Sequence, residues 1–139
     1  MGLYNFQPRF VPFILSGAKT HTIRALRAHP DQAGNTIHLY SGLRHKGARL
    51  LMRAMCTRVE EITIRQTRAA KYRYEIIIDG QVLDSDEITD LANRDGFACF
   101  GDMMDFWKGR LPFTGHVIHW KAIGKDQAFK KGLNKTDCK

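Results

Sequence analysis

Gly17-Ala18-Lys19-Thr20-His21-Thr22-Ile23-Arg24 is the stretch that decides the fold of this chain and its candidate site. The apolar segment 10–16 precedes it, and Gly17 stands where a glycine commonly ends a helix, so a short helix is predicted there. The alternating, β-branched residues 20–24 predict a strand. The chain therefore passes from a helix through a turn into a strand, with Lys19 at the junction.

The polar side chains of this stretch can meet at one rim. Alternation along a strand places Thr20, Thr22 and Arg24 on one face. Lys19 joins them if it lies in the turn, which Gly17 makes accessible. Two uses remain open: Lys and Arg bind a phosphate or a base carbonyl, or a Lys of lowered pKa serves as base for a Thr nucleophile. An ordinary charged surface strand is the plain alternative.

The rest of the chain is read mostly as strands followed by helices. Further strands are expected at 35–40, 50–64, 72–78, 81–83 and 115–121. Glu60-Glu61 should interrupt the long strand, and Asp79-Gly80 is a strong hairpin signal.

Two helices are expected before the last strand. Asp84 and Glu87 have the spacing of a capping box, and Gly96 closes the helix that follows. The apolar spacing of residues 100–107 predicts a second helix that ends by Gly109. The expected class is α+β: a small β-barrel of five to six mostly antiparallel strands with about three short helices.

Charge is concentrated in the first half of the chain. The net charge is +8, and residues 1–73 carry 13 Lys and Arg against 3 Asp and Glu. Residues 74–121 carry 4 against 9. A concentrated basic surface attracts polyanions through phosphate neutralisation and counterion release, so RNA or a nucleotide is the expected partner.

Organisation and location follow from what the chain contains. We expect one domain over residues 1–121 and a flexible, basic C-terminal tail over residues 122–139. No signal-peptide or membrane-spanning pattern is seen, which favours a cytoplasmic protein without a membrane partner.

Three scattered cysteines, at positions 56, 99 and 138, indicate reduced thiols. No zinc-ligand spacing is found, and neither a metal nor another cofactor is expected.

The segment from Leu15 to Arg24 resembles the GxKxxTxR signature of ASCH domains, which belong to the PUA-like superfamily. The resemblance extends through the strand at 37–41, the helix and acidic-Gly-Phe turn at 91–97, and the closing strand at 115–120. It covers about residues 5–121 and implies a PUA-like barrel with a cleft beside the first helix. Such modules are regarded as RNA-binding or coactivator-associated.

A bacterial branch of this family contains amidohydrolases that deacylate N4-acetylcytidine. The resemblance implies Lys19 as base, Thr22 as nucleophile and Asp95 as acidic partner, with Arg24 orienting the substrate. Those enzymes carry Glu where this chain has Asp95, which is shorter by one methylene. Further binding residues are expected at Arg27, Tyr40, Ser41 and Phe97.

Three functions remain open at this level. The first is recognition of RNA, a nucleoside or a nucleotide in a cleft lined by Lys19, Thr22, Arg24 and Asp95. The second is amide hydrolysis on N4-acetylcytidine. The third is metal-independent cleavage of single-stranded RNA with help from His21 or His119, because histidine can act as acid or base near neutral pH. The oligomeric state is not predicted.

Overall fold

A computed structural model describes residues 2–43, 47–67 and 74–123 of the chain. The order of elements is β1 (Gly2–Phe6), a 3₁₀ turn (Pro8–Phe10), α1 (Val11–Ser16), β2 (His21–Ala25), β3 (Thr36–Ser41), β4 (Arg49–Gln66), β5 (Tyr74–Ile78), β6 (Gln81–Val82), α2 (Ser85–Arg94), α3 (Phe100–Trp107) and β7 (Phe113–Ala122). The class is α+β, as predicted.

The strands form one mixed sheet built on β4. β7 pairs with β4 over residues 54–64, while β3 and β5 pair with the two ends of β4. Because β7 occupies one edge of β4, β3 and β5 follow each other along the opposite edge. β2 pairs with β7 and β1 with β3, which gives the path β1-β3-β4-β7-β2. The β1–β3 pair is parallel and the other pairs are antiparallel.

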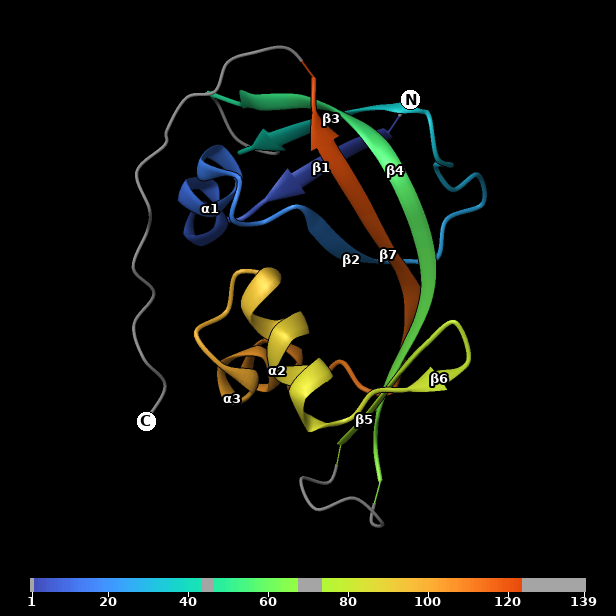
Figure 1. The fold of residues 1–139 in the computed structure, drawn as a ribbon. Coiled ribbons are helices and arrows are strands. Elements are labelled where there is room, and N and C mark those ends of the chain that lie inside the picture. The colour runs from blue at the N-terminus through green and yellow to red at the C-terminus, as the bar shows by residue number, and fades with distance from the viewer. Residues whose placement is uncertain (1, 44–46, 68–73, 124–139) are drawn as a thin grey trace.

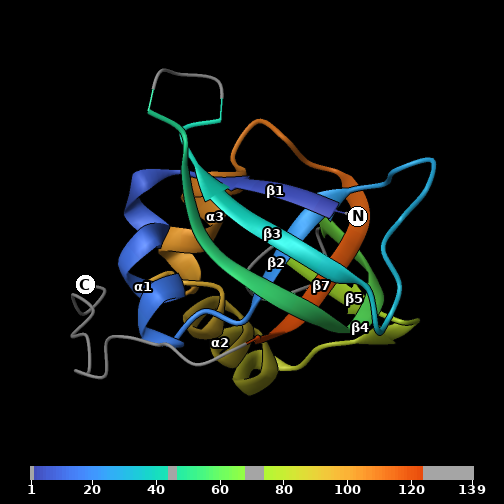
Figure 2. The ribbon, with the colours of Figure 1, turned by 90° about the horizontal axis from the view of Figure 1, so that it is seen from above.

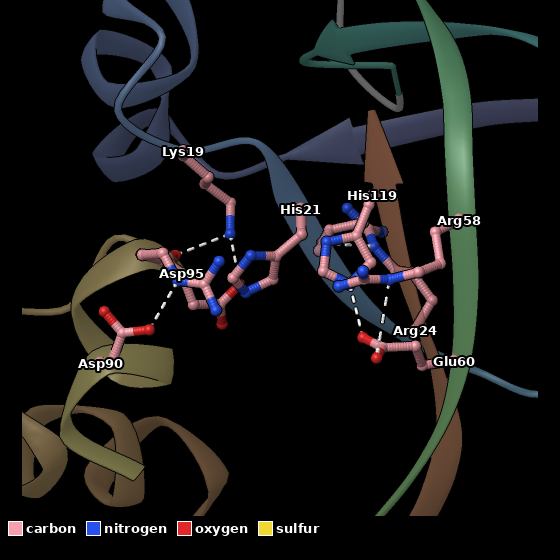
Figure 3. Close-up of polar contacts among 10 residues, drawn as sticks. Lys19, His21, Arg24, Arg58, Glu60, Asp90, Asp95 and His119 are labelled. Carbon is pink, nitrogen blue, oxygen red and sulfur yellow. Dashed lines mark hydrogen bonds and ion pairs between the residues drawn. The ribbon is translucent and has the colours of Figure 1, made fainter. Parts of the chain in front are cut away.

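The three α-helices lie along one side of the curved sheet, as Figures 1 and 2 show from two directions. Between the layers lies an apolar core in which the largest fully buried side chains include Tyr4, Ile14, Leu39, Ile64, Phe97 and Met103. α2 and α3 contact each other. The end of α2 lies near the turn between α1 and β2, where Lys19 contacts Asp95 (Figure 3).

Local signals in the sequence are confirmed at several boundaries. Gly17 ends α1 in the left-handed conformation, with φ 85°. Asp84 and Glu87 form the expected capping box at the start of α2. Asp79 and Gly80 both have positive φ and connect β5 to β6. The helix ends and the hairpin turn therefore lie where the local sequence, through its glycines and capping residues, predicts them.

Other expectations on strands were wrong. The sheet has seven strands within the described residues rather than five to six, partly because β1 was missed. β1 contains Gly2 and Asn5, which are residue types that strands disfavour. β4 is continuous through Glu60 and Glu61, and its irregularity lies between Cys56 and Arg58. Both carboxylates are tolerated there because neither side chain points into the core: Glu60 is half-buried and Glu61 is exposed.

The cysteines and the C-terminus complete the comparison with the sequence. Cys56 is a buried free thiol, whereas Cys99 is disulfide-bonded, so the expectation of reduced thiols was wrong for Cys99. Spacing along a chain does not report which sulfurs a fold brings together. The predicted tail spans residues 122–139; Ala122 is the last residue of β7, and the part from residue 124 onward lies outside the described residues. None of the helices within the described ranges has the length and apolar character to cross a membrane.

Candidate functional site

A cleft of about 420 Å³ opens between β1, β2 and the helical layer. Its volume falls in the range of about 300–1,000 Å³ that is usual for small-molecule sites. Its polar lining includes Lys19, Thr22, Arg24, Asp95 and Arg110. Aromatic side chains form much of the remaining wall, namely Phe6, Phe10, Phe97, Phe106, Trp107 and Phe113. The cleft therefore combines flat apolar surfaces with a few charged groups.

Lys19 lies in the turn between α1 and β2, which was the condition for it to meet Thr22 and Arg24. Its backbone N–H donates to the carbonyl of Phe13 at 2.9 Å, which fixes the turn against the helix end. Its Nζ donates to Oδ1 of Asp95 and to the backbone carbonyl of the same residue, both at 2.6 Å. Figure 3 shows the lysine side chain reaching from this turn to Asp95 at the end of α2. Residues 76 positions apart are thus joined.

Asp95 is held in place by the way α2 ends. Its N–H donates to Leu91 at 2.9 Å, and Gly96 follows with φ 101°. A Cβ at position 96 would lie 3.0 Å from the ring of Phe10 and 3.6 Å from Cδ of Lys19. Glycine is therefore required there both by its backbone conformation and by the close approach of Phe10, in the 3₁₀ turn before α1. This turn aims the carboxylate of Asp95 at the cleft.

Burial gives the Lys19–Asp95 pair its electrostatic character. Lys19 is 2% and Asp95 5% exposed. Burial alone would raise the pKa of Asp95, but the Lys19 ammonium and His21 outweigh it and hold this pKa below its usual range. A buried ion pair costs desolvation that its own attraction repays only in part, so it is weak evidence for stability. Charged groups of this kind cluster at functional sites.

Thr22 and Arg24 lie together on the cleft side of β2. Arg24 Nε donates to Oγ1 of Thr22 at 3.1 Å, and Nη2 donates to the carbonyl of Asn5 at 2.7 Å. The guanidinium carbon lies 4.7 Å from the ring centre of Phe6. Burial, reinforced by the nearby charge of Arg27, lowers the pKa of Arg24 to about 10. Arg24 is therefore a rigid cation whose charge is only partly compensated.

A row of polar side chains continues behind the pair, and the sequence did not reveal it as a unit. His21 Nε2 lies 3.2 Å from Oδ1 of Asp95, and the ring of His21 is 5.4 Å from that of His119. His119 Nε2 in turn lies 2.6 Å from Oε1 of Glu60, beside Arg58 (Figure 3). The sequence carries no local sign of this row, because His21 and His119 come together only through the pairing of β2 with β7, where they are directly opposite each other.

The remaining predicted binding residues are not all brought to the cleft. Phe97 lines it but is only 1% exposed, packed against Phe10 and Phe106. Arg27 stacks over Tyr4 at 4.3 Å, outside the lining. Tyr40 is half-buried on β3, and Ser41 donates to the carbonyl of Phe6 at 3.2 Å. Neither of these two lines the cleft.

Among the lining residues that were not predicted, Arg110 and Phe106 form a pair at the end of α3. Arg110 and Phe106 both line the cleft, with the guanidinium carbon 4.7 Å from the ring centre. The only signal was a lone arginine just after the helix stop at Gly109, within an acidic segment.

A second cleft of about 400 Å³ lies beside α2 and the β5–β6 turn, and His119 and Glu60 line it. Among residues 2–43, 47–67 and 74–123, no cluster of three or more potential metal-ligating side chains is present. Comparisons with protein-family models, curated proteins and solved structures found no match to this chain.

Proposed function

We propose that the first cleft binds a nucleobase, presented either by single-stranded RNA or by a free nucleoside. The observation that carries this proposal is the buried Lys19–Asp95 pair set in a wall of aromatic rings. A base needs flat faces to stack on and a few fixed donors and acceptors for its edges. Lys19 and Arg24 supply donors, and Asp95 supplies an acceptor.

The same proposal includes membership of the ASCH family and a sheet closed into a PUA-like barrel. The lysine, threonine and arginine of the GxKxxTxR pattern all line one cleft. β1 and β2 are the end strands of the path β1-β3-β4-β7-β2, and side chains link them. Arg24 donates to Asn5 at 2.7 Å and Arg27 to Leu3 at 3.2 Å. These bonds support a closed arrangement.

RNA is the partner that the charge distribution favours, and a cytoplasmic location is part of this proposal. The chain carries 22 Lys and Arg against 14 Asp and Glu. Affinity for labelled single-stranded RNA should therefore fall steeply between about 50 and 200 mM salt. Arg24→Gln should weaken binding at every salt concentration. Affinity that is independent of salt and of Arg24 would contradict the proposal.

Amide hydrolysis on N4-acetylcytidine is the second candidate, favoured by the short Lys19–Asp95 contact beside Thr22. Asp95, although shorter than Glu, reaches Lys19 at 2.6 Å. The neutral amine of Lys19 would accept the Thr22 hydroxyl proton as Oγ1 attacks the acetyl carbon, and the Asp95 carboxylate would stabilise the ammonium that forms. Arg24 would stabilise the oxyanion, and Lys19 would protonate the departing N4 amine. Water would then release acetate from Thr22, which regains its proton.

A time course with N4-acetylcytidine, read by chromatography, separates the two candidates. Wild type and the surface variant Lys121→Ala should form cytidine at equal rates, whereas Lys19→Ala and Thr22→Val should form none. Circular dichroism confirms that the variants remain folded. No conversion by wild type at high protein concentration would leave binding as the function, and conversion by Lys19→Ala would reject the catalytic roles.

RNA cleavage, the third function considered, receives less support from the geometry. His21 has no exposed surface, so it has no direct access to a substrate. His119 lines the second cleft rather than the first.

A further inference from the structure

His21 occupies a strand position that is normally apolar. Along β2, Thr22, Ile23 and Arg24 line the cleft, whereas His21 is fully buried and does not line it. Its neighbour across the sheet is His119 of β7, and the next pair along is Ile23 with Val117. A β-branched aliphatic residue would pack well at such a position. An imidazole there needs another explanation.

The contacts of His21 supply that explanation. The residue is fully buried, and neither ring nitrogen makes an aligned hydrogen bond to any described part of the chain. Burying polar atoms without such bonds is unfavourable. Yet Nε2 lies 3.2 Å from Oδ1 of Asp95, the same oxygen that accepts from Lys19. The ring is thus placed within reach of the acidic group of the cleft.

We propose that His21, in contact with the His119–Glu60 pair behind it, is a positioning residue for Asp95. Protonation of His21 then changes the affinity of the Lys19–Asp95 pair for a ligand. This inference rests on the function proposed above. His21 does not line the cleft, so it acts on a ligand only through Asp95. The second cleft, which His119 and Glu60 line, gives this row its contact with solvent.

Charged groups face His21 from three sides. Lys19 and Asp95 lie on the cleft side, at the turn and at the end of α2. His119 faces it from β7, and Glu60 and Arg58 of β4 lie behind His119. Burial lowers the pKa of His119, the bond to Glu60 opposes this, and His21 lowers it further. Two adjacent histidines resist carrying positive charge at the same time, because like charges repel.

The direction of the effect follows from the charges. Lys19 and Asp95 together are neutral, so protonating His21 adds one positive charge to the buried cluster. The carboxylate then contacts two cationic donors instead of one, and Lys19 is less fully neutralised. An anionic or carbonyl-bearing ligand should therefore bind more tightly as the pH falls from 8 to 6.

The first test needs no ligand. The ¹³C resonance of the Asp95 side-chain carboxyl is followed from pH 8 to 5 in wild type, His21→Gln and His119→Asn. The low pKa of Asp95 keeps it ionised over this range, so a change reports its neighbour. Wild type should show a step that His21→Gln lacks and that His119→Asn moves to higher pH. A flat wild-type profile, or the same step in His21→Gln, would overturn the proposal.

The second test uses labelled single-stranded RNA at constant ionic strength. Wild type and His29→Asn, an exposed control, should bind roughly fivefold more tightly at pH 6 than at pH 8. His21→Gln, which keeps an amide donor, should retain neutral-pH affinity but lose this dependence, and His21→Leu should lose both. Absence of binding by wild type at any pH would reject the proposed function and leave the carboxyl titration to decide the role of His21. An equal pH dependence in wild type and His21→Gln would reject the role of His21 alone.

Discussion

Two ion pairs at the C-terminal end of α2 show how differently the same chemistry can serve a fold. Asp90 and Arg94 pair at 2.9 Å on the helix surface, with side chains 62% and 51% exposed. Asp95, one residue later, pairs with Lys19 at 2.6 Å, with side chains 7% and 3% exposed. Water screens the first pair, so it contributes little. The second pair is desolvated, so each partner depends on the other.

The largest difference should appear when one partner of each pair is removed. Lys19→Met leaves a buried carboxylate without its cation and should lower the free energy of unfolding by about 3–5 kcal/mol. Urea denaturation at pH 7 measures this loss. The double variant Lys19→Met/Asp95→Leu should recover part of it, because it removes the orphaned charge. A single variant as stable as wild type would show that the pair is not desolvated in solution.

A smaller effect is expected from Asp95→Asn, about 2 kcal/mol at pH 7, because a charge-assisted hydrogen bond becomes a neutral one. The folded-state pKa of Asp95 lies below its ordinary value. Its stabilising contribution is therefore complete above about pH 4, the ordinary range of the group, and is lost as the pH falls through the folded-state pKa. Wild type should lose more stability than Asp95→Asn in this acidic range, and parallel curves would contradict this assignment.

Gly96→Ala tests the turn that aims the buried carboxylate. Its φ of 101° and the ring of Phe10 at 3.0 Å both oppose a Cβ. We expect a loss of about 1–2 kcal/mol in thermal or urea unfolding. Gly109→Ala, which has φ 81° but no atom within 4 Å, controls for backbone strain alone. Equal losses in the two variants would show that contact with Phe10 contributes nothing.

Arg94→Ala should have the smallest effect, about 0.3–0.5 kcal/mol, the usual contribution of an exposed pair at this helical spacing. Added salt should reduce it further, while the loss in Lys19→Met should change little with salt. An Arg94→Ala loss close to that of Lys19→Met would remove the contrast between the two pairs.

Much of the site could be predicted because its signals are local. The helix stop at Gly17 and the strand that follows place Lys19, Thr22 and Arg24 within eight residues. Gly96 locates the end of α2, whereas Asp95 was assigned to the site only by the family resemblance. Short-range backbone chemistry determines these features, so they can be predicted from the sequence without the tertiary structure.

The rest depends on long-range pairing, which sequence periodicity does not encode. His21 and His119 meet only because β2 and β7, almost one hundred residues apart, adopt one particular register. Arg110 reaches the cleft only because α3 packs beside it. The apolar stripe of α3, assigned to the core, was indeed buried at Met103, Met104 and Trp107.

The 18-residue length of β4 has a consequence for how the protein opens and closes. Its central segment, residues 54–64, is bonded to β7 along its whole length and overlaps β3 and β5 at its two ends. Neither end of the sheet can detach completely without disturbing this shared strand. Amide hydrogen exchange should therefore be slowest in the middle of β4 and β7, which we expect to behave as a single foldon.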